Sequence, residues 1–320
     1  MIKVLNLENV EFSSKHGIYK GNETYKEGII YNDEMWILKY FSDIEEFDEE
    51  GNKLERSQTA LSEFIASHIF DILGYQVQET MLAKRYDSLV VICKDFAIEK
   101  DLIGVDKLHN AAPWEVLKLE YNTIKPVKVI YDDQIQSYIF HFKHNPKFSN
   151  IEGITERFWE QAIIDVFINN GDRGTTNWGV LKDANGVMTL APMFDNGNSL
   201  HTPLTEDEIE ELLVNDKLLY NSVLSTSSTY LAIRYTEYFI GNEDLRKAVL
   251  RTVPLIESKL KTIFTFIDSI PEYWTFEDGT KLMVCSANRK KLYKKHLMIR
   301  LEVLLKPLYE AAMNYRSDKE

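Results

Sequence analysis

The fold of this chain is decided by residues 169–181, which read NNGDRGTTNWGVL, together with residues 191–197, which read APMFDNG. Between these runs the sequence predicts a short hairpin, because residues 178–181 and 188–190 have strand character and residues 183–186 are typical of a turn. The two runs therefore stand at the open end of one hairpin, where distant parts of the chain meet.

Three oxygen-bearing side chains flank this hairpin. Asp172 and Asn177 come just before its first strand, and Asp195 comes just after its second strand. These side chains can converge on one point, and Mg²⁺ binds oxygen ligands, with one or two from the protein and the rest from phosphates and water. The pattern predicts a magnesium–nucleotide site. Asp, Asn and Gly are also the usual turn residues, so on these residues alone a turn without chemistry is an equal alternative.

The composition is that of an ordinary globular protein with excess negative charge. The chain has 320 residues, of which 44% are hydrophobic and 27% charged, and its formal net charge is −13. This length allows one large domain or two lobes with ample core. The negative charge argues against direct binding of nucleic acid, because that affinity depends on lysine and arginine density.

The sequence gives no sign of a membrane segment or a secretory signal. No run approaches the apolar length that spans a bilayer, and residues 1–8 lack the signal pattern. The two cysteines, Cys93 and Cys285, form neither a disulfide framework nor a metal-ligand spacing, so we expect buried thiols. We expect no membrane partner and a cytoplasmic location, with secretion by a signal-independent route left open.

Residues 1–97 are predicted to form a strand-rich N-terminal lobe that packs one helix against an antiparallel sheet. Asn32-Asp33 is a good two-residue hairpin turn. Gly74 ends the helix, whose apolar residues repeat at intervals of three and four. The expected elements are strands over residues 28–31 and 34–40, a helix over residues 60–73, and strands over residues 80–86 and 89–96.

Residues 98–320 are predicted to form a helical C-terminal lobe that carries the opening motif. Residues 98 to about 150 are polar and irregular, and after Asp195 we expect an almost wholly helical chain. The C-terminal lobe is therefore expected to be mostly helical, which makes the chain an α+β protein of two lobes. A capping box begins at Thr205 and includes Glu208. The expected helices lie near residues 113–117, over residues 154–167, after the capping box, and over residues 243–252, 255–268 and 289–314.

Phosphoryl transfer needs a cradle over the phosphates, a fixed cation, a metal with its ligands, and a group that orients the attacking hydroxyl. Lys39 lies inside a predicted strand, where an inward lysine is costly unless it is paired. Glu63 on the following helix can pair with it. The glycine-containing loop of residues 17–28 is the candidate cradle. The alternatives are an edge lysine that reaches water and a surface glutamate without a partner.

In this order, the motifs resemble the HipA-like atypical serine/threonine protein kinase family, and within it the compact, CtkA-type members. The likeness covers about residues 14–96 and 154–200. It rests on four blocks: residues 31–39, 62–80, 90–96 and 169–200. The resemblance implies a two-lobed protein-kinase-like fold with ATP and Mg²⁺ as cofactors.

The resemblance also implies a role for each motif residue. Asp172 would be the catalytic aspartate that orients the substrate hydroxyl, Lys39 would contact the phosphates, and Glu63 would brace Lys39. Asn177 and Asp195 would bind Mg²⁺. The residues expected to bind the nucleotide, with the backbone at 94–96 as an adenine-binding hinge, are Gly21, Lys26, Lys39, Lys94, Asp95 and Phe96.

Two departures from the family pattern bear on activity. Gly174 follows Asp172-Arg173 where the family usually has a histidine, and the loop over the phosphates is poor in glycine. Two other functions therefore stay open. One is a pseudokinase that binds nucleotide or a partner without transferring phosphate. The other is a phosphotransferase for a small molecule, with the acids of residues 205–211 lining its acceptor pocket.

The partners follow from the resemblance alone. It implies a protein substrate with a serine or threonine hydroxyl, and HipA-type proteins often pair with an antitoxin. Such kinases also often phosphorylate themselves in or near the phosphate loop. The hydroxyls available there are Ser13, Ser14 and Thr24.

Overall fold

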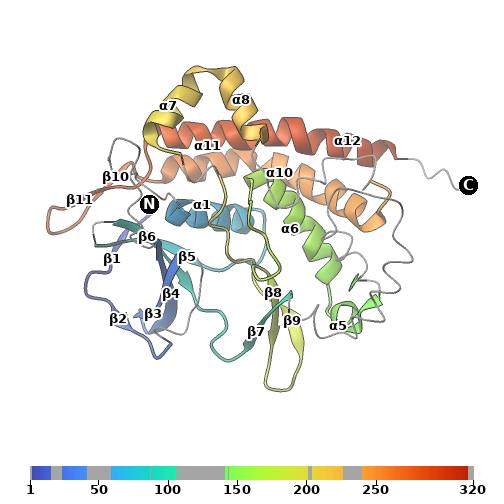
Figure 1. Ribbon diagram of the computed structural model, residues 1–320, viewed down its shortest axis with the longest axis horizontal. Coiled ribbons are helices and arrows are strands. Elements are labelled where there is room, and N and C mark those ends of the chain that lie inside the picture. Colours follow the sequence, from blue (N-terminus) through green and yellow to red (C-terminus); the bar gives the residue numbers. More distant parts are fainter. Residues whose placement is uncertain are drawn as a thin grey trace, which may run out of the picture.

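The structure is a computed structural model that describes residues 2–15, 24–41, 59–86, 88–105, 107, 141–142, 144–200, 204–225 and 240–315. Gly21 and the helix predicted near residues 113–117 lie outside the described residues. Of the described helices, none is long and apolar enough to cross a membrane. The described elements form a sheet at the N-terminal end and a group of helices that extends away from it (Figure 1).

Six strands form the N-terminal sheet in the order β1-β5-β6-β4-β3-β2. All neighbours are antiparallel except β1 and β5. Asn32 and Asp33 both have positive φ, 51° and 62°, as the predicted two-residue turn requires. The strands are β1 (Leu5–Asn6), β2 (Glu11–Phe12), β3 (Thr24–Tyr31), β4 (Glu34–Phe41), β5 (Thr80–Arg85) and β6 (Ser88–Lys94).

One face of this sheet packs against helix α1 (Thr59–Ile72), which ends at Gly74 with φ 85°. Alternate residues of a strand point to opposite faces, so β6 directs Val91 and Cys93 into the same core as α1. Trp36 and Leu38 of β4 belong to a second core cluster on the opposite face. This alternation leaves Lys39 on the side of the sheet that faces α1.

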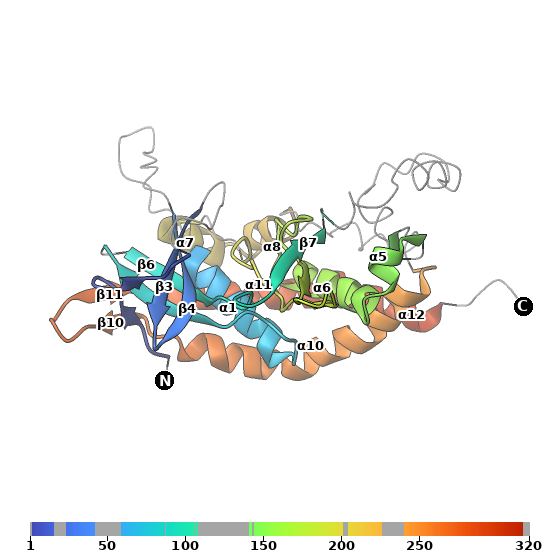
Figure 2. The same ribbon diagram turned by 90° about the horizontal axis from the view of Figure 1, so that it is seen from below.

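The longer described helices lie where the sequence predicted them, but α5 and α8 were not predicted, and the helix predicted over residues 289–314 contains a π-helical segment. The predicted segments 243–252 and 255–268 form a single helix, which passes through Pro254. This long helix runs beneath α1 and α6 in the view of Figure 2. The helices are α5 (Pro146–Ser149), α6 (Ile154–Ile168), α7 (Glu206–Val214), α8 (Asp216–Ser225), α10 (Glu243–Ser269), α11 (Ala287–Arg300), the π-helical η2 (Leu301–Leu305) and α12 (Lys306–Asn314).

The hairpin predicted from the opening motif is present. It consists of β8 (Gly179–Lys182) and β9 (Met188–Leu190), to which β7 (Asp101–Gly104) adds a third strand. A Cβ at Gly179 would lie 2.3 Å from the Ile103 carbonyl oxygen, so this close pairing of β7 with β8 requires glycine. The sequence did not predict β7.

The described part of the C-terminal lobe is mostly helical, as predicted, but it contains strands that the sequence did not predict. Besides β7, a second hairpin of β10 (Tyr273–Thr275) and β11 (Lys281–Met283) follows α10. Its strands have only three residues each, and Trp274 and Leu282 pack against the main core. The two hairpin strands were missed because a three-residue run has too few positions to show a period.

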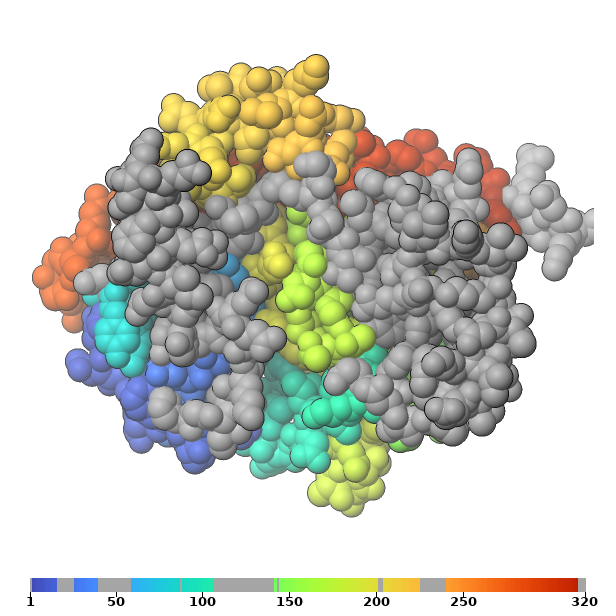
Figure 3. Space-filling model, in the orientation of Figure 1, coloured from blue at the N-terminus to red at the C-terminus, as the bar shows by residue number. Residues whose placement is uncertain are grey.

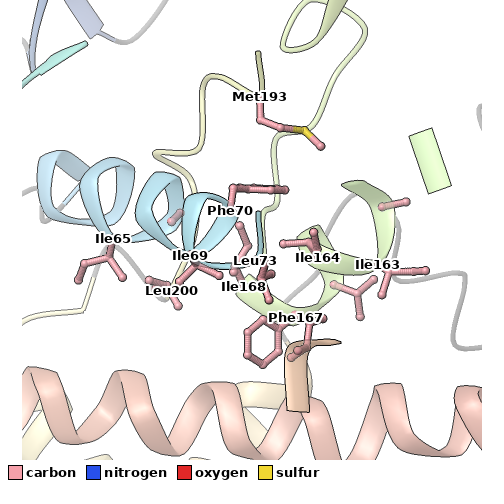
Figure 4. Packing of buried hydrophobic residues seen from close by; sticks show 14 of the residues in the cluster. Ile65, Ile69, Phe70, Leu73, Ile163, Ile164, Phe167, Ile168, Met193 and Leu200 are labelled. Atoms are coloured by element: carbon pink, nitrogen blue, oxygen red, sulfur yellow. The ribbon is translucent and has the colours of Figure 1, made fainter. Parts of the chain in front are cut away.

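The main core includes buried side chains of α1, α6 and α10. Figure 4 shows side chains of α1 directed toward side chains of α6, with Met193 and Leu200 from the segment after β9 beside them. Because the α1 core also includes Leu82 and Val91 of the sheet, one continuous core holds the hairpin ends next to the N-terminal strands. Cys93 and Cys285 are buried and free, and burial raises the pKa of each thiol to about 12.

Candidate active site

Lys39 and Glu63 form a buried ion pair between β4 and α1. The Lys39 Nζ lies 2.8 Å from the Glu63 Oε2, and both side chains are less than 10% exposed. The alternation of β4 directs Lys39 toward α1, where Glu63 is buried. The alternatives of an edge lysine in water and an unpartnered surface glutamate therefore do not describe these two residues.

Asp195 completes this cluster from the other end of the sequence. Its Oδ1 lies 3.0 Å from the Lys39 Nζ. Burial alone would lower the pKa of Lys39, but Asp195 and Glu63 outweigh it and raise that pKa well above its ordinary value. The Lys39 charge, opposed by burial and aided by Lys26, lowers the pKa of Asp195. At neutral pH one ammonium thus stands between two carboxylates.

Asp172 and Asn177 meet directly before β8. The Asn177 Nδ2 donates to the Asp172 backbone oxygen at 2.6 Å and to its Oδ2 at 3.2 Å. Asp172 is exposed, so its carboxylate can meet a group that arrives from solvent. The Asn177 amide therefore holds the loop closed and fixes the direction of the Asp172 carboxylate.

Arg173 ties the two ends of the hairpin together, a function that the sequence did not assign to it. It is fully buried, and its Nε and Nη2 pair with the Asp165 carboxylate of α6 at 2.9 and 3.1 Å. Its Nη1 donates to the Asn177 oxygen at 2.8 Å and to the Phe194 oxygen at 2.5 Å. One nitrogen thus contacts the backbone at Asn177 and at the residue before Asp195. The only indication of Arg173 in the sequence was its position next to the candidate residue Asp172.

Residues 195–197 touch α1 closely. The backbone N–H of Asn196 donates to the Glu63 Oε1 at 2.9 Å. At Gly197 a Cβ would lie 2.7 Å from Thr59 Cγ2 and 3.3 Å from Glu63 Oε2. Only glycine lets this loop approach the start of α1 so closely.

The described residues expected to bind the nucleotide lie on β3, on β4, and at and just after the end of β6. Lys26 is the cross-strand neighbour of Lys39 in the β3–β4 ladder, so both lysines share one face. Phe96 packs against Phe194 with ring centroids 5.6 Å apart. The Asp95 Oδ2 accepts from Lys15 Nζ at 2.8 Å, which ties the segment after β2 to the expected hinge.

Lys94 contributes only its backbone to this region. Its ammonium pairs with Glu34 at 2.7 Å and with Glu79 at 3.6 Å on the exposed side. The Lys94 carbonyl accepts from Gln78 Nε2 at 2.9 Å. The Gln78 N–H donates to the Met193 oxygen at 2.8 Å, so Gln78 links the expected hinge to the segment that leads to Asp195. Sequence reasoning did not single out Gln78.

Gly174, which stands where a histidine was expected, has open space around it. A Cβ built there would meet no heavy atom within 4 Å. Crowding around the Cβ position therefore does not explain why this residue is glycine.

The donor set suits a magnesium ion that is shared with phosphates. No group of three or more His, Cys, Asp or Glu among the described residues could hold a metal by itself. Mg²⁺ at nucleotide sites needs only one or two protein ligands, with phosphate and water supplying the others. The side-chain oxygens of Asn177 and Asp195 are of the required type, on segments that Arg173 brings together.

Comparisons with known proteins identify relatives of this chain and of its fold. No family model matches the chain. A curated relative, the serine/threonine-protein kinase CtkA of Helicobacter pylori, is 27% identical over 271 residues, which cover 82% of this chain and 78% of CtkA. The crystal structure of a Helicobacter pylori proinflammatory kinase CtkA matches with a TM-score of 0.75 at 22% identity, over 98% of this chain and 100% of that chain.

A third match is weaker. The HipA of Shewanella oneidensis MR-1, in a complex with HipB and its operator DNA, matches with a TM-score of 0.45 and 12% identity over 92% of this chain and 69% of that chain. The match to CtkA alone therefore carries the fold. The chain is homologous to CtkA, and the predicted two-lobed α+β kinase-like fold is confirmed.

Proposed function

We propose, starting from the homology of this chain to a serine/threonine-protein kinase, that it is an ATP- and Mg²⁺-dependent serine/threonine protein kinase of the HipA/CtkA type. One observation carries the proposal. The Lys39 ammonium contacts both Glu63 and Asp195, so three segments far apart in the sequence meet at the fixed cation that phosphoryl transfer requires.

In this mechanism the residues of the chain act by position and charge. Lys39, held by Glu63, contacts the phosphates and meets the negative charge that develops on the transferred group. Asp172, oriented by Asn177, accepts a hydrogen bond from the substrate hydroxyl and aligns it for attack. Asn177 and Asp195 hold Mg²⁺, which neutralises charge on the phosphates when it is bound.

The nucleotide is proposed to lie along the expected hinge. The backbone at Lys94, Asp95 and Phe96 binds the adenine, and Lys26 lies near the phosphates, while Gly21 stays a candidate from the sequence alone. Support for this placement comes from the shared face of Lys26 and Lys39 and from the contact between Phe96 and Phe194. The boundary between the two lobes, at residues 97 and 98, stays a prediction.

A protein substrate fits the structure better than a small molecule. Two of the acids that were candidates for a small-molecule pocket have structural partners. Glu206 pairs with Arg289 at 2.9 Å, and Glu208 closes the predicted capping box with Thr205. We also propose a cytoplasmic location and, less directly, an antitoxin partner.

The test of the proposed function is phosphate transfer by Asp172→Ala. Without the oriented carboxylate we expect the rate to fall by about 10²–10⁴-fold, the usual contribution of such a group, while ATP binding persists. Asp195→Ala should also lose Mg²⁺-dependent ATP binding. Transfer is measured with labelled ATP on the protein itself and on a protein pool. If wild-type protein with Mg²⁺ and ATP labels neither, the pseudokinase alternative replaces the proposal.

The same incubation tests self-phosphorylation. Ser13 is buried and its Oγ accepts from the Lys15 N–H, whereas Ser14 is exposed; the side chain of Thr24 lies outside the description. We therefore expect added phosphate on Ser14 rather than Ser13. An intact-mass spectrum without a gain of one phosphate, or with the same gain in Ser14→Ala, contradicts this site.

A further inference from the structure

Asn196 is a buried asparagine next to Asp195, and neither the motifs nor the proposed mechanism gives its side chain a role. It is fully buried. Its Oδ1 accepts from Arg173 Nη2 at 2.5 Å, and its Nδ2 donates to the Ser67 Oγ of α1 at 3.0 Å. One amide thus joins the loop of Asp172 to the helix of Glu63.

Each end of this connection reaches residues that are expected to bind Mg²⁺ or to hold the lysine that contacts the phosphates. On one side Arg173 contacts the backbone at Asn177 and at the residue before Asp195. On the other side, Ser67 lies one helical turn beyond Glu63, and the Asn196 N–H itself donates to the Glu63 carboxylate. The amide therefore stands between α1 and the two segments that carry Asn177 and Asp195.

The chemistry of the site needs an amide. Arg173 has donors only, so its partner must accept, while the Nδ2 supplies a donor to Ser67. In a buried site each of these groups would otherwise lose its hydrogen bond at a cost. A carboxylate would add a negative charge beside Glu63 and Asp165, and an apolar residue would remove one of the acceptors of Arg173 Nη2, which also donates to Asp165.

We propose that Asn196 is a positioning residue that fixes Asn177 and Asp195 relative to each other and to Glu63, and thereby sets the Mg²⁺ affinity of the nucleotide complex. The inference rests on the proposed function. Groups that orient metal ligands without touching the metal typically change metal affinity or activity by 10–100-fold when they are removed.

Calorimetry measures the Mg²⁺ concentration at which binding of a non-hydrolysable ATP analogue is half-maximal. The melting temperature of each variant is measured as well. In Asn196→Ala we expect this concentration to rise by about 10–100-fold. In Ser67→Ala, which loses one hydrogen bond to Asn196, we expect a rise of about fivefold. The double variant should resemble Asn196→Ala, because Ser67 acts only through Asn196.

Ser62→Ala is the matched control. Ser62 is buried in the same helix, whereas the Asn196 Nδ2 donates to Ser67. We expect the Mg²⁺ requirement of this variant to stay at the wild-type value even if its melting temperature falls. A purely structural role for Asn196 would move the melting temperature and leave the Mg²⁺ requirement unchanged.

The possible results separate this inference from the proposed function. If wild-type protein binds Mg²⁺ and the analogue, and Asn196→Ala binds them with the same Mg²⁺ requirement, the inference is overturned and the proposed function stands. If wild-type protein does not bind the analogue in the presence of Mg²⁺, both are overturned. Should Asn196→Ala fail to fold, an unchanged Mg²⁺ requirement in Ser67→Ala overturns the inference alone.

Discussion

Two glycines near the candidate site have opposite surroundings. Gly197 lies against Thr59 and Glu63, whereas Gly174 has open space where a side chain would begin. Each glycine comes two residues after an expected site residue, Asp172 or Asp195, so the sequence does not distinguish them. Their surroundings differ because α1 approaches Gly197 closely, and this tertiary contact cannot be read from the sequence pattern.

This difference predicts unequal effects of alanine at the two positions. Gly197→Ala should destabilise the fold by about 1–3 kcal/mol, as overpacking does, because Thr59 must shift, and it should lower phosphate transfer because Glu63 must give way slightly. Gly174→Ala should stabilise it by about 0.4–1 kcal/mol by restricting the unfolded chain. Urea denaturation measures both free energies. Equal destabilisation by the two variants would contradict the surroundings described for them.

The ion pair of Lys39 and Asp195 predicts a pH dependence of stability. The folded pKa of Asp195 is lowered from 3.8, so its contribution is present above about pH 4 and is lost as the pH falls through the folded value. The folded pKa of Lys39 is raised, so its contribution is present below 10.5 and is lost as the pH rises through the folded value. Asp195→Asn should therefore lose less unfolding free energy between pH 7 and pH 3 than wild-type protein does. Denaturation at the two pH values checks this, and an equal loss contradicts it.

At the scale of elements, the sequence predicts helices that have a long apolar repeat and hairpins that have clear turn residues. The helix over residues 154–167 and the turn at Asn32-Asp33 were found because apolar spacing and turn chemistry are local. β7 and the β10–β11 hairpin were missed because their pairing partners lie far away or their strands have three residues. Their existence depends on tertiary contacts, which propensity does not encode.

The α7 capping box gives a prediction at this scale. Thr205 accepts from the Glu208 N–H, and the Glu208 side chain accepts from the Thr205 N–H. Thr205→Ala should destabilise the protein by about 0.5–2 kcal/mol, because the first turn of α7 loses its cap. Phosphate transfer to protein should stay at the wild-type rate. A loss of transfer without a loss of stability would instead place the acceptor site at α7.

At the scale of the molecule, the candidate site is where the two halves of the chain meet. The N-terminal strands and the C-terminal helix α12 lie toward opposite ends of the face in Figure 3. Between them, Lys39 reaches Asp195, Glu63 reaches Asn196, and Gln78 reaches Met193.

The sequence named the expected site residues by motif. It did not predict that Arg173, Asn196 and Gln78 connect the segments of the site. Asn196 and Gln78 each contact a residue more than a hundred positions away, and Arg173 contacts a backbone oxygen 21 positions away, which no short sequence spacing predicts.

The central claim is that Lys39, Asn177 and Asp195 form one Mg²⁺–ATP site. A crystal structure of the protein with Mg²⁺ and a non-hydrolysable ATP analogue tests it most directly. We predict phosphates in contact with the Lys39 ammonium, a metal ion bound by side-chain oxygens of Asn177 and Asp195, and adenine against the backbone at residues 94–96. A nucleotide bound elsewhere, or phosphates at Lys39 with no metal at Asn177 and Asp195, would contradict the claim.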